Sequence, residues 1–128
     1  MSVEAIQNDE QALPSPAEHV IGFVVSQVEC DAVTSAMTKV GVPITQIKVL
    51  HGQNGIELFD QMMDGALWGE DAERVMKMGE EVLRSEQFVF IVNAKDRDEG
   101  LRIAKAAESH GGHGFTHFGS LADERLTR

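Results

Sequence analysis

Short strand-like runs of two kinds constrain the fold of this chain more than any other sequence feature. Residues 20–25 (Val-Ile-Gly-Phe-Val-Val) and 88–92 (Phe-Val-Phe-Ile-Val) are apolar at nearly every position, which is typical of strands buried on both faces. Residues 46–50 and 115–118 mix polar and apolar positions, as edge strands often do. The contrast predicts that the first two runs lie at the centre of a sheet and the other two at its edges.

Helical segments separate these runs along the chain. Capping signals of the form Ser-x-x-Glu and Asp-x-x-Glu open two of them, at Ser26 and at Asp96. Glycines end both helices, as is common at helix C-termini. The stretch 51–87 between the second and third runs predicts a helical insertion. The expected helices run from Ser26 to Gly41, over 55–64, over 70–84 and over 97–109.

The order of elements is therefore strand-helix-strand, a helical insertion, and again strand-helix-strand. Right-handed crossovers leave a gap between the two strands of each half. Interleaving the halves predicts an α+β protein with a ferredoxin-like split βαβ fold, whose antiparallel sheet has the order 4-1-3-2 when the runs are numbered along the chain. In that order the two fully apolar runs are central, which agrees with their pattern.

In such a fold the two crossover helices cover only one face of the sheet. The central runs are apolar on both faces, and burial of a Val, Ile or Phe side chain contributes about 1.5–3 kcal/mol. The second face therefore needs a cover, which either the insertion at 51–87 or a second subunit provides. We expect a homodimer, with the insertion contributing to its interface.

Composition predicts one domain and excludes some partners. We expect a single domain over 19–128, after a polar, flexible tail over 1–18 that contains Pro14 and Pro16. The formal net charge of −10 repels phosphates, so nucleic acid and membranes are not expected partners. The start of the chain lacks the pattern of a secretory signal. Cys30 is the single cysteine, and we expect a cytoplasmic protein with no disulfide.

The stretch 109–117 (Ser-His-Gly-Gly-His-Gly-Phe-Thr-His) is the most suggestive for chemistry. His110, His113 and His117 lie close together in sequence, and imidazole is a common ligand of divalent metals, the one cofactor that we consider. His51 is expected at the same end of the sheet but three strand spacings away, roughly 14 Å. It could join such a metal only across a subunit interface. In the alternative interpretation the glycines cap a helix and the histidines are turn residues.

Two glycine-containing turns are candidate ligand sites, each with a simpler interpretation as a plain turn. Gly111, Gly112 and Gly114 could present backbone N–H groups to a carboxylate or phosphate. They follow a helix C-terminus, however, whose dipole disfavours anions. The second turn contains His51, Gly52 and Gly55. We predict no catalytic residue, because the lone cysteine lies on an apolar helix face and is expected to be a buried thiol.

The motif His51-Gly-x-x-Gly55 after the second strand, with the glycine-rich turn before the fourth, resembles small uncharacterised bacterial ferredoxin-like proteins. Some of these are grouped with general-stress proteins. The architecture is also similar to PII signalling proteins and divalent-cation tolerance proteins, which place a long excursion between strands 2 and 3. The basic residues with which PII loops hold nucleotide phosphates are missing here. The resemblance implies an oligomeric ferredoxin-like protein and assigns no catalytic residue.

These observations lead to one hypothesis and two alternatives. The hypothesis is a cytoplasmic, non-enzymatic, oligomeric regulatory or stress-related module that binds a small-molecule ligand. The first alternative is a divalent-metal-binding protein that uses His110, His113 and His117. The second is a small ferredoxin-like dimeric enzyme with a cavity between its helices and its sheet.

Overall fold

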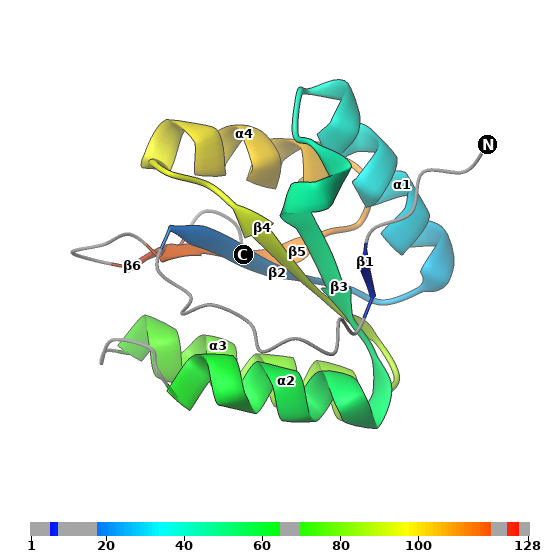
Figure 1. The fold of residues 1–128 in the computed structure, drawn as a ribbon, viewed down its shortest axis with the longest axis vertical. Helices are drawn as coiled ribbons and strands as arrows, with labels where there is room; N and C mark the ends of the chain where they lie inside the picture. Colours follow the sequence, from blue (N-terminus) through cyan, green and yellow to red (C-terminus); the bar gives the residue numbers. More distant parts are fainter. Residues whose placement is uncertain (1–5, 8–17, 65–69, 119–122, 126–128) are drawn as a thin grey trace.

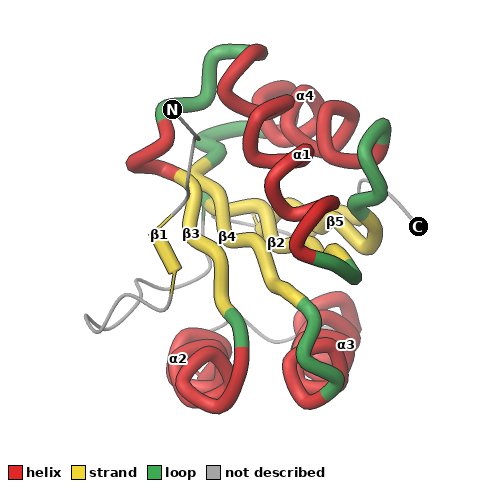
Figure 2. The backbone as a smooth tube through the Cα atoms, turned by 90° about the vertical axis from the view of Figure 1, so that its right-hand side faces the viewer, coloured by secondary structure: helices red, strands yellow, loops and turns green. Residues whose placement is uncertain are grey.

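The computed structural model describes residues 6–7, 18–64, 70–118 and 123–125, and in it a sheet lies between two layers of helices (Figures 1 and 2). The class is α+β, as predicted. The elements in chain order are β1 (Ile6–Gln7), β2 (His19–Val24), α1 (Gln27–Lys39), the 3₁₀ turn η1 (Ile44–Gln46), β3 (Ile47–Leu50), α2 (Gly52–Asp64), α3 (Glu70–Arg84), β4 (Phe88–Asn93), α4 (Arg97–Glu108), β5 (His113–Phe118) and β6 (Asp123–Arg125).

The sheet has the strand order β1-β3-β4-β2-β5-β6. Its four main strands, β3, β4, β2 and β5, are antiparallel to their neighbours. This confirms the predicted order and the central position of the two apolar runs, and it is consistent with a ferredoxin-like fold. The prediction that β3 and β5 are edge strands is wrong, because β1 pairs with β3 and β6 pairs with β5. Strands this short have no periodicity that a sequence pattern can show.

Strand β1 lies inside the segment that we expected to be a tail. Ile6 and Gln7 run parallel to β3, opposite Lys48 and Val49. The rest of that segment up to residue 17 lies outside the described residues. At these two positions the chain adds a strand to the sheet, in place of the tail predicted there.

Helices α1 and α4 cover one face of the sheet (Figure 2). Both begin at the predicted caps: the Ser26 hydroxyl accepts a hydrogen bond from the N–H of Glu29 at 3.2 Å, and the Asp96 carboxylate accepts one from the N–H of Glu99 at 2.9 Å. The core beneath them is almost wholly apolar. Its larger members are Val20, Val24, Val33, Met37, Ile47, Val49, Phe88, Phe90, Val92, Ile103 and Phe115.

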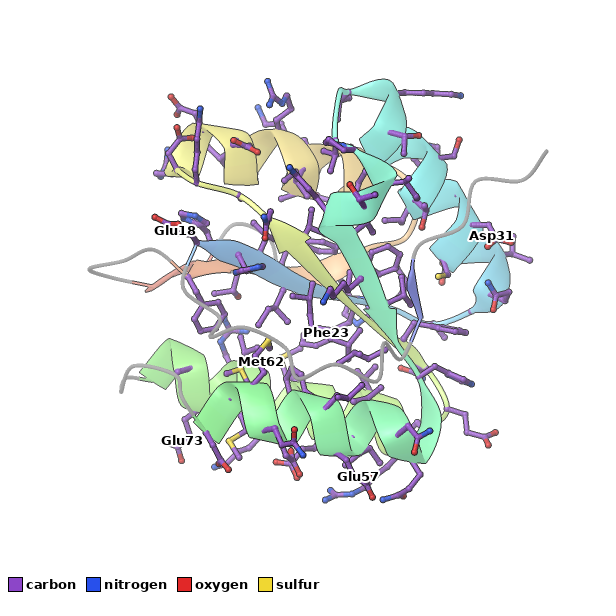
Figure 3. All side chains as sticks on the ribbon, in the orientation of Figure 1. Glu18, Phe23, Asp31, Glu57, Met62 and Glu73 are labelled. Carbon is purple, nitrogen blue, oxygen red and sulfur yellow. The ribbon has the colours of Figure 1, made fainter. Side chains whose placement is uncertain are left out.

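Helices α2 and α3 cover the opposite face, so the insertion itself is the second cover. Phe23 and Met62 point into the space between sheet and helices, whereas Glu57 and Glu73 point away from it (Figure 3). The side chains buried there include Ile21, Phe23, Leu50, Leu58, Phe59, Met62, Met63, Val75, Leu83, Val89, Ile91 and Phe118. The exposed apolar face that favoured a homodimer is therefore closed within one chain. The homodimer itself stays a prediction.

Helix α2 begins at Gly52, three residues before the predicted start. The prediction of a turn over 51–55 is therefore wrong from Gly52 onward. Gly55 is buried in the first turns of the helix, although Asn54-Gly55 is a common turn sequence. Burial of the apolar face of α2 against the sheet outweighs this local preference. Within the described parts of the chain, no helix has both the length and the apolar character needed to cross a bilayer.

Gly79 of α3 lies directly against Phe59 of α2. A Cβ atom at this position would overlap with the ring of Phe59. In most helices a change from glycine to alanine stabilises by about 0.5–1 kcal/mol, because glycine costs backbone entropy. Here the aromatic ring occupies the space that the methyl group needs.

We therefore expect Gly79→Ala to lower the free energy of unfolding by about 1–3 kcal/mol. The measurement is urea denaturation followed by circular dichroism. The control is Glu73→Ala on the exposed side of the same helix, for which we expect a change within about 0.5 kcal/mol. Stabilisation by Gly79→Ala would contradict the close packing of α2 on α3.

Asp60 of α2 carries a carboxylate oxygen, Oδ1, that is shielded from solvent and has no hydrogen-bond partner among the described residues. Burial, together with the negative charges of Glu80 and Asp64, raises the pKa of this carboxyl, and Arg84 only partly opposes them. The folded state therefore holds the Asp60 proton more tightly than the unfolded state does. Stability consequently falls as the pH rises from the pKa of the unfolded carboxyl through the higher pKa of the folded one.

We expect Asp60→Asn to stabilise the protein at pH 7 by up to about 1 kcal/mol, because it removes a shielded negative charge. The gain should vanish in acid, where Asp60 is protonated in both states. Thermal unfolding at several pH values measures both effects. Glu57→Gln, on the exposed side of α2, is the control and should show no such gain. A loss of stability in Asp60→Asn at pH 7 would show that the ionised carboxylate does not destabilise the fold.

Candidate functional site

The predicted histidine constellation is divided by an irregularity in β5. His113 and His117 are four residues apart, a spacing that places side chains on one face of a regular strand. However, Thr116 pairs with Ile21 and His113 pairs with Phe23, so three steps along β5 match two along β2. This is the pattern of a β-bulge, and Gly114 within it has φ +67°. The extra residue turns His113 and His117 to opposite faces of the sheet.

The three histidines accordingly have different surroundings. His117 is buried beneath the α1–α4 layer, and its Nε2–H donates to the carbonyl oxygen of Ala94 at 3.0 Å. His113 lies on the α2–α3 side, where its ring centroid is 6.0 Å from that of Phe23. His110 is exposed in the turn after α4. No three His, Cys, Asp or Glu side chains in the described part of the chain lie close enough to hold a metal ion.

The glycine-rich turn functions as the C-terminal cap of α4. The N–H groups of residues 110–112 donate to the carbonyl oxygens of Ala107 and Glu108 at 2.9–3.4 Å. The carboxylate of Glu29 lies directly against Gly111, where a Cβ atom would overlap with it. Donors already used in the cap, next to a negative charge, do not form an anion cradle. The turn therefore supports the capping interpretation for Gly111 and Gly112.

His51 lies between β3 and α2, and its side chain contacts the segment in which α3 is followed by β4. Its ring stacks on Phe88 with the centroids 4.4 Å apart and an interplanar angle of 15°, and its Nδ1–H donates to the carbonyl oxygen of Gln87 at 3.2 Å. The register places Leu50, Val89, Phe23 and His113 in one row across the sheet. His51 follows that row at the end of β3, which is three strand spacings from β5 as expected.

Cys30 is a buried thiol, as predicted. It lies on the inner side of α1 and is 2% exposed. Burial, with a smaller contribution from the charge of Asp31, raises its pKa to about 12. The thiol is therefore protonated at neutral pH, and it lacks the thiolate character of a nucleophile.

The α2–α3 face of the sheet ends in polar side chains, and these form the candidate site. Lys48 pairs with Ile91, whose side chain is part of the apolar core on that face. Residues two positions apart on a strand share a face, so Asn93 lies on the same side as Ile91. His19 pairs with Asn93 from the adjacent strand β2. At this end of the face, the rows of apolar side chains are therefore followed by polar side chains from three neighbouring strands.

These side chains line a partly open pocket of about 220 Å³. Ile91 forms its buried floor, Lys48 and His19 are half-buried, and Asn93 is exposed at the rim. The described lining residues are His19, Thr45, Gln46, Lys48, Ile91 and Asn93, none of them acidic. The volume is below the 300–1,000 Å³ that is usual for drug-sized ligands, so the pocket suits a smaller molecule.

No sequence pattern singled out this pocket in advance. The alternation in 46–50 places Gln46 and Lys48 on one side of the strand, but we interpreted their polarity as a sign of an edge strand. His19 and Asn93 flank the ends of the two apolar runs, which is a weak signal. Only the register, which pairs His19 with Asn93 and Lys48 with Ile91, brings the four residues together.

No protein-family model, curated protein or solved structure matches this chain.

The surroundings of the histidines predict unequal effects of their removal. His117→Ala should lower the free energy of unfolding by about 2 kcal/mol or more, because it leaves a cavity and an unpaired carbonyl group. His110→Ala should change it by less than about 0.5 kcal/mol. Chemical denaturation, with and without Zn²⁺, measures both variants. Stabilisation of the wild type by Zn²⁺ that disappears in His110→Ala would contradict the separation of these residues.

Proposed function

We propose that this protein is a non-enzymatic regulatory module that binds a small molecule in the polar pocket between β3, β4 and β2. The observation that carries the proposal is the convergence of Lys48, His19 and Asn93 at one end of a sheet face whose core is mostly apolar. Departures of this kind from the apolar pattern are expected where a protein binds a ligand.

The described residues of the pocket lack two common catalytic arrangements. Its described lining residues include no carboxylate and no cysteine, so they provide neither a pair of acid–base carboxylates nor a thiol nucleophile. Cys30 lies in the opposite layer of the structure, beneath α1.

The fold, the regulatory role, the location and the oligomeric state that the sequence predicts are part of this proposal. We propose the split βαβ form of the ferredoxin-like fold, because α1 and α4 both cross on one face of an antiparallel sheet with the expected order. Such a fold, with a long excursion between β3 and β4, supports a regulatory role like that of the proteins it resembles. The cytoplasmic location and the homodimer remain predictions, and sedimentation analysis tests the latter.

A thermal-shift screen with small metabolites of mixed charge tests the proposed function. At a ligand concentration of about 100 times the Kd, binding stabilises by roughly 2.7 kcal/mol, which raises the Tm by several degrees. Asn93→Trp places a large side chain at the pocket rim and should abolish the shift. Gln53→Trp, on the exposed side of α2, should keep it.

Two results would count against the proposal. An equal shift in the wild type, Asn93→Trp and Gln53→Trp would place the binding elsewhere on the protein. The absence of a shift with every compound would remove the support for a ligand-binding module of this kind.

A further inference from the structure

We infer that the ligand of this pocket is a small anion, a carboxylate or a phosphate, bound by the ammonium group of Lys48 with His19 and Asn93 as further hydrogen-bonding groups. The inference rests on the proposed function and adds the chemical class of the ligand.

The register places these groups around one small space. Lys48 comes from β3 and His19 from β2, the two strands that flank β4. Strands lie about 4.8 Å apart, so the backbones of Lys48 and His19 stand roughly 10 Å apart across the sheet and two residues apart along it, with Ile91 and Asn93 between them. Their side chains line the same pocket from both sides. A ligand with few non-hydrogen atoms fits between them.

Charge favours an anion over other ligands. Lys48 is the permanent charge among the described lining residues, and no acidic side chain accompanies it there. Hydrogen bonds from a charged donor to a carboxylate or phosphate are about twice as strong as neutral ones. A half-buried position strengthens them further, because water screens the charges less. A cationic ligand would instead be repelled by Lys48.

The charge of the described pocket residues differs in sign from the net charge of the chain. The chain carries a formal net charge of −10, so its surface as a whole repels anions. Both Lys48 and His19 already take part in interactions within the chain. An anion therefore exchanges with an existing partner or adds to it, and the affinity is expected to lie between micromolar and millimolar.

Isothermal titration calorimetry with three probes tests the inference. Inorganic phosphate and succinate are the two anions, and succinamide is the neutral analogue of succinate. We expect saturable binding of at least one anion by the wild type and none of succinamide. The stronger anion distinguishes a phosphate ligand from a carboxylate ligand.

The variants assign the binding to Lys48. Lys48→Gln should weaken anion binding roughly tenfold or more, whereas Lys48→Arg should retain most of it because the positive charge is kept. The matched control is Lys105→Gln on α4, an exposed lysine in the opposite layer, which should bind as the wild type does. Circular dichroism of each variant checks that it is folded.

Three results would overturn the inference: equal anion binding by Lys48→Gln and the wild type, equal binding of succinamide and succinate, or no binding of either anion at concentrations on the order of 10 mM. A neutral metabolite whose binding is lost in Asn93→Trp but kept in Lys48→Gln would refute the anion and leave the proposed function intact. The two proposals therefore fail in distinguishable ways.

Discussion

Burial of β2 and β4 on both faces is the constraint on which the rest of the structure depends. Val20 and Val92 lie in the core under α1 and α4, while Ile21 and Ile91 lie in the core under α2 and α3. A sheet with two apolar faces needs a helical layer on each side. The crossover helices provide one layer and the insertion provides the other, so the long segment between β3 and β4 has a structural reason.

A single extra residue in β5 determines on which face of the sheet His113 and His117 lie. The bulge beside Gly114 reverses the side on which His113 lies relative to His117. One histidine becomes a buried hydrogen-bonding residue and the other packs against an aromatic ring. The proximity in sequence that indicated a metal site is therefore not proximity in space.

The pocket lies where the apolar rows of the α2–α3 face end. Lys48, His19 and Asn93 come from three strands and meet because the strands are in register. Lys48 and His19 also take part in interactions within the chain. Lys48, the one polar residue of β3, lies at this end of the face although β3 is not an edge strand.

Local signals in the sequence determined the helix caps at Ser26 and Asp96, the two central strands and the buried thiol of Cys30, because each depends on neighbours along the chain. The order of the main strands followed from these elements and from the handedness of crossovers. The helical start at Gly52, the two short outer strands, the bulge and the pocket were decided only by the tertiary structure. Each depends on a partner distant in sequence, and the register that selects this partner is set by packing of the whole sheet.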